Sequence, residues 1–463
     1  MDNLENLKQV RLKKLEDLKK AGINSYPAEV SRTHTNKEVL DNFNKLVIPA
    51  KGGSASGGKK IILVGRIRSI RGHGGSTFFN IEDGSAQIQA YLKKDSVGER
   101  DYKLFLDTID IGDFIELNGA LFKTKKGEKT LEVKKWKILT KSILSTPGEW
   151  YGLEDIEERF RKRYLDLILN KEVKEKFIKR SQIIGKIRKF LDENGFLEVE
   201  TPMLQTIAGG AKAKPFKTHL NALDMDLYLR IAPELYLKRL LVGGLEKVYE
   251  IGRNFRNEGM DREHNPEFTM LEFYAAYWNY ETMMEFTEKL LKSLDGKIFG
   301  KKFKRVEYDK LVYPVKSREA GSPAAIFNGA SEKEVFEKIK EPTFVINHPT
   351  EISPLSKKLE KDAKKVARFQ LIVQGLEIAN GFSELNDPLD QKERFDAQEK
   401  ERRGGSQEAH PYDKDFIEAL EYGMPPAAGI GIGIDRLVVL LTDSKTLREI
   451  ILFPTMKPKE NYD

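Results

Sequence analysis

The segment RNFRNEGMDREHNPEFTMLEFY, residues 253–274, decides the fold of the second half of this chain. Two runs with strand-like alternation flank a polar loop, Asn257–Glu267, and this pattern predicts a long hairpin. Residues two apart share one face of a strand, so Glu272 and Tyr274 project from one surface, with Arg256 close by. A guanidinium suits a phosphate or carboxylate, and carboxylates suit an ammonium. An isolated hairpin of this kind is more often an exposed, salt-bridged one, so the assignment of a site depends on other segments.

Two other segments complete a set of motifs in the right order. The set resembles the motifs of the class II aminoacyl-tRNA synthetases: GFLEVETPML at Gly195–Leu204 as motif 1, FRNE at Phe255–Glu258 with Phe268 and Glu272 as motif 2, and GIGIGIDRLVV at Gly429–Val439 as motif 3. Two phrases are similar to the lysine-specific members, RIAPELYLKRL at Arg230–Leu240 and NGFSELNDP at Asn380–Pro388. The chain therefore resembles the class II lysyl-tRNA synthetases along its whole length.

Length and patterning predict an α+β protein with several domains. The expected parts are an N-terminal helical segment with a flexible linker (1–55), an OB-type β-barrel (56–145), a linker helix (146–180) and a class II catalytic domain (181–463). The resemblance implies that the catalytic domain is built on an antiparallel sheet flanked by helices. A poorly patterned insertion occupies about 295–340, and no function is assigned to it.

Charge and cysteine content exclude several classes of site. The chain has 79 Lys and Arg residues against 72 Asp and Glu residues, a net charge of +7 that permits a polyanionic partner without proving one. It has no cysteine, which excludes disulfides and thiolate metal sites. No apolar run approaches the roughly 20 residues that a membrane-spanning helix needs. We therefore expect a cytoplasmic protein without a membrane span.

Five strand-like runs between Ile61 and Thr140 predict the small barrel. Barrels of this type bind single-stranded nucleic acid by stacking bases and by a basic rim. The resemblance implies that this barrel reads the tRNA anticodon, with Phe78 stacking on a base and with Arg71 and Gln89 bonded to base edges. Lys135 stands where the family usually has a glutamate, so base discrimination at one anticodon position stays open.

Two segments before the barrel have simpler explanations. The run AKGGSASGGKK at Ala50–Lys60 contains the spacing GxxxxGK, but Lys60 stands where a P-loop needs Ser or Thr, so we predict a linker. Residues 4–20 carry leucines at helical spacing among many Lys and Arg residues. This helix either packs on its neighbour or contacts RNA phosphates with its basic face, and both alternatives stay open.

The resemblance implies a site that joins two anions, the lysine carboxylate and the α-phosphate of ATP. Such a reaction needs positive charge and positioning more than a nucleophilic side chain. The two catalytic residues are then Arg256, which bridges the carboxylate and the α-phosphate, and Arg436, which binds the γ-phosphate and covers one face of adenine. The remaining ATP-binding residues are Glu258, His264, Phe268 and Glu377. His264 is also consistent with an ordinary surface histidine.

Magnesium is the expected cofactor, because it offsets phosphate charge and prefers oxygen ligands. The family places two carboxylates ten and three residues before Asn380. Glu377 matches the nearer position, but Gln370 occupies the farther one. An amide oxygen can coordinate magnesium without adding negative charge, so the number of bound ions is open.

An ammonium needs acceptors in a buried pocket, because an unpaired buried charge is costly. The resemblance supplies these acceptors for L-lysine: Glu272, Tyr274 and Glu384 at the ε-ammonium, Phe382 along the methylene stem, and Gly210, Glu234, Arg256 and Asn380 at the α-amino and carboxylate end. Relatives specific for aspartate or asparagine need a cation or an amide at the far end, whereas this pocket is acidic.

The resemblance implies ATP-dependent ligation of L-lysine to tRNA(Lys), an AMP- and diphosphate-forming reaction, by a homodimer. Two alternatives stay open at this point. One is a paralogue that lysylates a protein acceptor, although such paralogues generally lack the barrel. The other is a non-catalytic RNA-binding paralogue, which only Gln370 supports.

Overall fold

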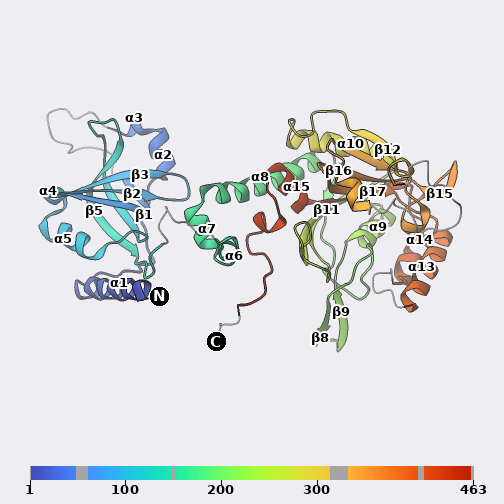
Figure 1. Ribbon diagram of the computed structural model, residues 1–463, viewed down its shortest axis with the longest axis horizontal. Coiled ribbons are helices and arrows are strands. Elements are labelled where there is room, and N and C mark those ends of the chain that lie inside the picture. Colours follow the sequence, from blue (N-terminus) through green and yellow to red (C-terminus); the bar gives the residue numbers. More distant parts are fainter. Residues whose placement is uncertain are drawn as a thin grey trace. The chain divides into compact units, whose positions relative to one another are not determined.

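The computed structural model describes residues 2–47, 61–146, 153, 155–312, 332–404 and 411–459. The linker predicted at Ala50–Lys60 and the middle of the 295–340 insertion lie outside these residues. The chain divides into two compact units, Met1–Gly152 and Leu153–Asp463, and each is described by itself (Figure 1).

The first unit is built around a closed five-stranded barrel. Its strands follow the order β1-β2-β3-β5-β4 and comprise β1 (Ile61–His73), β2 (Ser76–Glu82), β3 (Gln87–Lys93), β4 (Phe114–Lys123) and β5 (Lys129–Thr140). Buried and part-exposed residues alternate along β2, β3 and β4, so that one face of each strand fills the barrel. Gly119 lies at a β-bulge, where a Cβ atom would meet the Glu132 carbonyl oxygen at 2.0 Å. The predicted OB-type barrel is confirmed.

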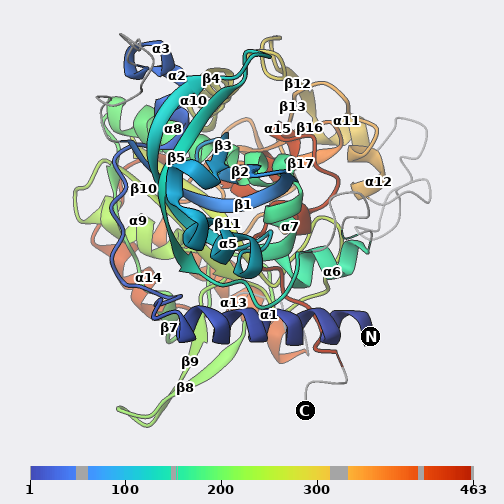
Figure 2. The same ribbon diagram turned by 90° about the vertical axis from the view of Figure 1, so that its left-hand side faces the viewer.

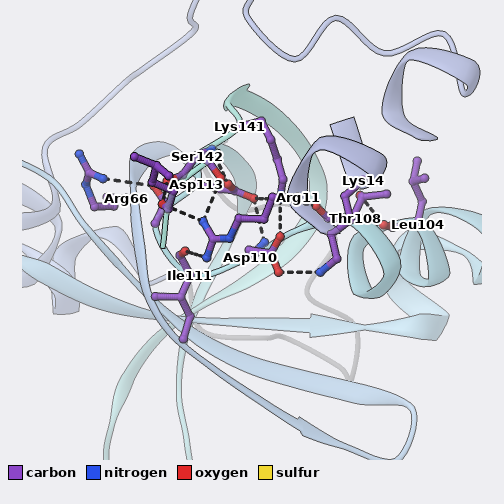
Figure 3. A network of polar contacts seen from close by, with 12 residues as sticks. Arg11, Lys14, Arg66, Leu104, Thr108, Asp110, Ile111, Asp113, Lys141 and Ser142 are labelled. Carbon is purple, nitrogen blue, oxygen red and sulfur yellow. Dashed lines mark hydrogen bonds and ion pairs between the residues drawn. The ribbon is translucent and has the colours of Figure 1, made fainter. Parts of the chain in front are cut away.

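Five short or amphipathic helices accompany the barrel: α1 (Asp2–Lys20), α2 (Asn36–Asp41), α3 (Phe43–Leu46), α4 (Lys94–Val97) and α5 (Glu99–Thr108). A polar network fastens α1 to the barrel (Figure 3). Lys141, whose side chain is fully buried, pairs with Asp110 at 2.6 Å and Asp113 at 2.8 Å. Lys14 of α1 also pairs with Asp110 at 2.6 Å, and Arg11 donates to three backbone carbonyls. Part of the basic face of α1 therefore serves packing.

The second unit contains an eight-stranded sheet in the order β12-β13-β16-β17-β18-β11-β10-β6. The strands are β6 (Leu197–Glu198), β10 (Lys247–Phe255), β11 (Glu267–Ala276), β12 (Lys304–Glu307), β13 (Thr343–Ile346), β16 (Arg368–Val373), β17 (Leu376–Ser383) and β18 (Ala427–Gly433). Pairing is antiparallel through the middle and parallel at both edges, between β6 and β10 and between β12 and β13. The predicted antiparallel sheet flanked by helices is confirmed.

The hairpin that was predicted from residues 253–274 consists of β10 and β11. Leu271 and Phe273 of β11 belong to the main hydrophobic core, together with residues of α8 (Lys171–Glu193), α10 (Tyr280–Leu294) and α15 (Ile434–Leu441). Because side chains alternate along a strand, Met270, Glu272 and Tyr274 point to the opposite face. Tyr274 packs there in a smaller cluster with residues of α9 (Glu234–Val242), α13 (Pro388–Arg403) and α14 (Lys414–Glu421).

The remaining described elements are short. They are α6 (Ile156–Arg161), α7 (Arg163–Leu169), β7 (Leu204–Gln205), β8 (Lys217–Leu220), β9 (Met225–Leu229), α11 (Tyr308–Val312), α12 (Glu332–Phe336), η2 (Thr350–Ile352), β14 (Lys358–Leu359), β15 (Asp362–Val366) and η3 (Leu447–Glu449). Strands β7, β9 and β8 form a separate sheet, whose β8–β9 hairpin extends away from the rest of this unit in Figures 1 and 2. No helix in the described ranges is long and apolar enough to span a membrane.

Candidate active site

A cavity of about 450 Å³ opens on the face of the sheet that carries Glu272 and Tyr274. Of the site residues predicted in the catalytic half of the chain, all but Glu384 line this one cavity: Gly210, Glu234, Arg256, Glu258, His264, Phe268, Glu272, Tyr274, Gln370, Glu377, Asn380, Phe382 and Arg436. They come from strands β11, β16 and β17, the starts of helices α9 and α15, and the loops between β7 and β8 and between β10 and β11. Residues up to 226 positions apart in the sequence, Gly210 to Arg436, thus meet in one cavity.

One end of the cavity carries positive charge. The guanidinium of Arg256 lies over the Phe268 ring, 5.1 Å from its centroid. The backbone amide of Arg256 donates to the Pro266 carbonyl at 2.8 Å, which closes the base of the hairpin loop. Its Nε atom is buried and has no hydrogen-bond partner in the described part of the chain. An unpaired guanidinium N–H in a cavity suits an anionic ligand.

Arg436 connects this loop to β17. One of its nitrogens, Nη1, donates to the Glu377 carbonyl at 3.0 Å, and Nη2 donates to His264 Nε2 at 3.0 Å. His264 Nδ1 lies 2.9 Å from the Asp261 carboxylate, so the ring donates there and accepts from Arg436. His264 was consistent with a surface histidine, and its side chain is indeed half exposed, but it also holds Arg436 in place.

The two predicted magnesium ligands, Glu377 and Gln370, differ in their surroundings. Glu377 lines the cavity beside Arg436, whereas the Gln370 amide is bound to His348, with Oε1 2.7 Å from Nε2. Burial lowers the pKa of His348 to about 3, so this partner is neutral. Among the described residues, no three His, Cys, Asp or Glu side chains cluster as a metal site. Glu377 can supply one carboxylate to an oxygen-bound cation, whereas the Gln370 amide oxygen is already hydrogen-bonded to His348.

The other end of the cavity is acidic, and its carboxyl groups are buried. Glu272 is 3% exposed and accepts a hydrogen bond from the Tyr274 hydroxyl at 2.9 Å. Burial, together with the nearby Glu234 carboxylate, raises the pKa of Glu272 to about 8. Burial likewise raises the pKa of Glu384 to about 8 and raises that of Glu234. Glu384 Oε1 has no hydrogen-bond partner among the described residues.

Alternating glycines in β18 make room for this acidic end. A Cβ atom on Gly429 would lie 2.2 Å from Tyr274 Cε1 and 2.4 Å from Glu384 Oε1. A Cβ atom on Gly431 would lie 2.5 Å from Met270 Cε. The isoleucines between these glycines belong to the core on the opposite face of the sheet. The pattern GIGIG thus places a bare backbone against the pocket and apolar side chains against the core.

Sequence reasoning missed two cationic residues of this site. Arg368, on β16, lines the cavity and donates from Nε to Asn380 Oδ1 at 2.9 Å. Lys238, on α9, is fully buried and pairs with Glu234 at 2.6 Å and with Glu384. The i, i+4 spacing of Glu234 and Lys238 was the available signal for the second residue. The sequence signal for Arg368 was weaker: this residue lies two positions before Gln370, on the same face of the strand.

The predicted anticodon residues lie together on the outside of the barrel in the first unit. Arg71 of β1 is opposite Phe78 of β2, and Phe78 is opposite Tyr91 of β3. The Phe78 and Tyr91 ring centroids are 4.5 Å apart, and Phe122 continues the row at 5.9 Å from Tyr91. These two further aromatics were not predicted from the sequence.

The two remaining barrel residues flank this row. Gln89, two residues before Tyr91 on the same face, accepts from the Thr130 hydroxyl at 2.8 Å, which leaves its amide N–H groups for a ligand. Lys135 is exposed on β5, opposite Asn118 of β4. The outer face of the barrel therefore combines stacking rings with polar and basic side chains, as single-stranded nucleic acid requires.

Comparisons with known proteins identify both domains and the family. Residues 155–457 match the family of class II tRNA synthetases (D, K and N), and residues 61–139 match the OB-fold nucleic acid binding domain. The chain is 49% identical to the lysine–tRNA ligase of Carboxydothermus hydrogenoformans, over 99% of both proteins. It is 49% identical to that of Pelotomaculum thermopropionicum, over 99% of this chain and 96% of the relative, and 46% identical to that of Bacillus cytotoxicus, over 98% and 97%. With its barrel, its class II sheet and its acidic pocket, the chain belongs to the class II lysine–tRNA ligase family.

Proposed function

We propose that this protein activates L-lysine with ATP and transfers the lysyl group to the 3′ end of tRNA(Lys). The observation that carries the proposal is the polarity of the cavity, which has Arg256 and Arg436 at one end. Two buried glutamates, Glu234 and Glu272, line the other end, and the buried Glu384 lies behind its wall. Lysine has a carboxylate at one end and an ammonium at the other, so it matches this polarity. Family membership over the full length supports the same reaction.

In the first step, a lysine carboxylate oxygen attacks the α-phosphorus of ATP. The new O–P bond gives lysyl-adenylate, the bond from phosphorus to the bridging oxygen breaks, and diphosphate leaves with its electron pair. Two anions must approach each other, and Arg256 supplies the positive charge between them. No side chain needs to act as a nucleophile, because orientation and charge carry this reaction.

ATP is held by the same end of the cavity. Arg436 donates to the Glu377 carbonyl and to His264, and it would bind the γ-phosphate end of ATP. Adenine would stack between Arg436 and Phe268. The Glu258 carboxylate accepts a hydrogen bond from the backbone N–H of Lys214 at 3.3 Å. This bond connects the loop between β10 and β11 to the segment after Gly210.

Magnesium would be held by the Glu377 carboxylate together with the phosphates. When bound, the ion neutralises phosphate charge and makes diphosphate a better leaving group. Gln370 contributes an amide oxygen to it only if the hydrogen bond to His348 is given up. The protein's own groups at this end, the two arginines, orient the triphosphate independently of the number of ions.

Lysine specificity resides at the acidic end. Glu272, Tyr274 and Glu384 receive the ε-ammonium, and Phe382 packs on the methylene stem. Glu234 and the Gly210 backbone bind the α-ammonium, while Asn380, held by Arg368, binds near the carboxylate. A site built to pair a buried polar group rejects analogues that lack the group by about 10⁴–10⁵-fold, because its own polar groups are then left unpaired.

The barrel and the motif 1 segment would each bind a macromolecular partner, namely tRNA(Lys) and a second copy of this chain. Arg71, Phe78 and Gln89 would bind the anticodon bases of tRNA(Lys). Around motif 1, Leu197, Met203 and Leu204 are 46–52% exposed, and such apolar side chains support a homodimer. A cytoplasmic location stays a prediction from the sequence.

Lysine-dependent ATP–diphosphate exchange, followed by charging of tRNA(Lys), tests the proposal. We expect exchange with lysine at low millimolar magnesium, and none with aspartate or asparagine. Exchange without charging of tRNA would instead favour a paralogue with a protein acceptor. No exchange with any amino acid, together with retained RNA binding, would favour the non-catalytic alternative. The presence of Arg256 and Arg436 in the same cavity as buried glutamates disfavours that alternative.

A further inference from the structure

Lys238 is an ammonium that lies behind the wall of the lysine pocket. It stands one turn after Glu234 on α9, and its side chain is fully buried. Its Nζ atom lies 2.6 Å from Glu234 Oε1 and also forms an ion pair with Glu384. It lies 5.2 Å from the centroid of the Phe382 ring. Glu234 and Phe382 line the cavity, whereas Lys238 does not.

The charges around this ammonium are unbalanced without a ligand. Three buried carboxyl groups, Glu234, Glu272 and Glu384, lie near one another, and one buried ammonium, Lys238, pairs with Glu234 and Glu384. Two carboxylates therefore lack a cation of their own, and a lysine substrate brings two ammonium groups.

The neighbouring charges do not correct the imbalance. Arg230, beside Glu272, pairs with Glu250 of β10. Arg368 of β16, beside Glu234, donates to Asn380 and Ser353. The Tyr274 hydroxyl is neutral and donates to Glu272.

We infer that Lys238 is a positioning and specificity-determining residue: its single ammonium holds Glu234 and Glu384 in place and opposes their protonation, and so limits the number of further ammonium groups that the pocket admits. This inference rests on the proposed lysine-activating function. It adds a group that never touches the substrate but acts on two carboxyl groups of the lysine pocket, Glu234 in the cavity wall and Glu384 behind it.

Loss of the Lys238 charge has a defined chemical consequence. Glu234 and Glu384 would then be two neighbouring buried carboxyl groups without a shared cation, and each would hold a proton to a higher pH than it does in the wild type. A protonated acid is a poorer partner for an ammonium than a carboxylate is. Lysine binding would weaken at neutral pH and recover as the pH rises and the proton leaves. A residue that only supported the packing of α9 would produce no such recovery.

The test compares full-length wild type with Lys238→Met in lysine-dependent ATP–diphosphate exchange between pH 7 and pH 9. We expect the KM for lysine to rise at least about 10-fold at pH 7, with the KM for ATP and the kcat at saturating lysine changed less than about threefold. The ratio of the variant KM to the wild-type KM should fall towards pH 9. Lys141→Met is a matched control, because Lys141 is a fully buried lysine between two carboxylates in the other unit. This control should leave the KM for lysine unchanged at every pH.

A double-mutant cycle separates action through Glu384 from other effects. If Lys238 works through that carboxylate, Lys238→Met should add less to Glu384→Gln than it adds to wild type. Should Lys238→Met fail to fold by circular dichroism, Lys238→Arg replaces it. The arginine keeps the charge, so a raised KM with the pH dependence of wild type is expected, and recovery at high pH in that variant would overturn the inference.

Two further results would overturn it: an unchanged KM for lysine in Lys238→Met at pH 7, or equal rises in both KM values at every pH. A wild type without lysine-dependent exchange would refute the proposed function instead, and the two failures are therefore distinguishable.

Discussion

Glu272→Gln should make the free protein more stable and the lysine site weaker, and the two effects share one cause. Glu272 is 3% exposed, and burial followed by the Glu234 charge raises its pKa to about 8 from an ordinary 4.5. A carboxyl group with a raised folded-state pKa contributes its full stability below the unfolded pKa. That stability is lost as the pH rises through the folded pKa, here between about 4.5 and 8.

The size of the effect follows from the shift. One pKa unit corresponds to about 1.4 kcal/mol, so at pH 7 the Glu272 carboxyl lowers the free energy of unfolding by roughly 3 kcal/mol relative to pH 4.5. Glutamine has nearly the same shape, accepts the same hydrogen bond from Tyr274 and has no charge to bury. It removes this cost, but it also removes a charged partner of the ε-ammonium, which is worth roughly 1.5–3 kcal/mol, or about 10- to 150-fold in the KM for lysine.

Urea unfolding of wild type and Glu272→Gln without ligands, at pH 5 and at pH 8, measures the first effect. We expect a small difference in the free energy of unfolding at pH 5 and a gain for the variant of a few kcal/mol at pH 8. The KM for lysine in ATP–diphosphate exchange measures the second effect. A stability difference that is equal at the two pH values would refute the reasoning, because it would show that the carboxyl does not titrate as its burial requires.

Three other predictions follow from the same geometry. Because burial keeps Glu272 and Glu384 protonated in the free protein at pH 7, with pKa values of about 8, lysine binding should release protons; calorimetry in buffers of different ionisation enthalpy measures this, and a net release of zero would contradict it. Phe78→Ala should weaken tRNA(Lys) binding by about 1–3 kcal/mol, the worth of one stacked base, while ATP–diphosphate exchange stays unchanged; an equal loss in exchange would show that the barrel has another task. Gln370→Glu should lower the magnesium concentration for half-maximal exchange several-fold and tighten Mn²⁺ binding seen by electron paramagnetic resonance; unchanged values in both measurements would show that this position does not face the cation.

The sequence predicted the parts of this protein that depend on local alternation. Residues 253–274 do form the hairpin, and the period of two correctly put Glu272 and Tyr274 on one face of β11. The same period predicted the barrel strands, since buried residues alternate along β2 and β3. Motif resemblance then brought together residues that no local pattern connects.

Contacts between distant elements were beyond local patterns. A lysine on an amphipathic helix is normally solvated, and nothing in RIAPELYLKRL shows that α9 is covered by α14 and β11, which buries Lys238. Similarly, Gln370 was identified as a departure from a carboxylate position, but its bond to His348 depends on a segment 22 residues away. In each case a polar side chain is held by a partner that only the tertiary fold supplies.

The acidic pocket illustrates why affinity and stability are opposed at this site. Exposed carboxylates would attract an ammonium by no more than about 1 kcal/mol, because water screens such pairs. Buried carboxylates bind it more strongly, but the free protein must then hold them without a ligand. Three features reduce that cost here: Lys238 pairs with two of the carboxylates, the Tyr274 hydroxyl donates to the third, and the raised pKa values allow protons to replace the missing cation. Lysine is then the ligand whose two ammonium groups take the place of those protons, and for this reason the charge of the pocket, as well as its shape, selects the substrate.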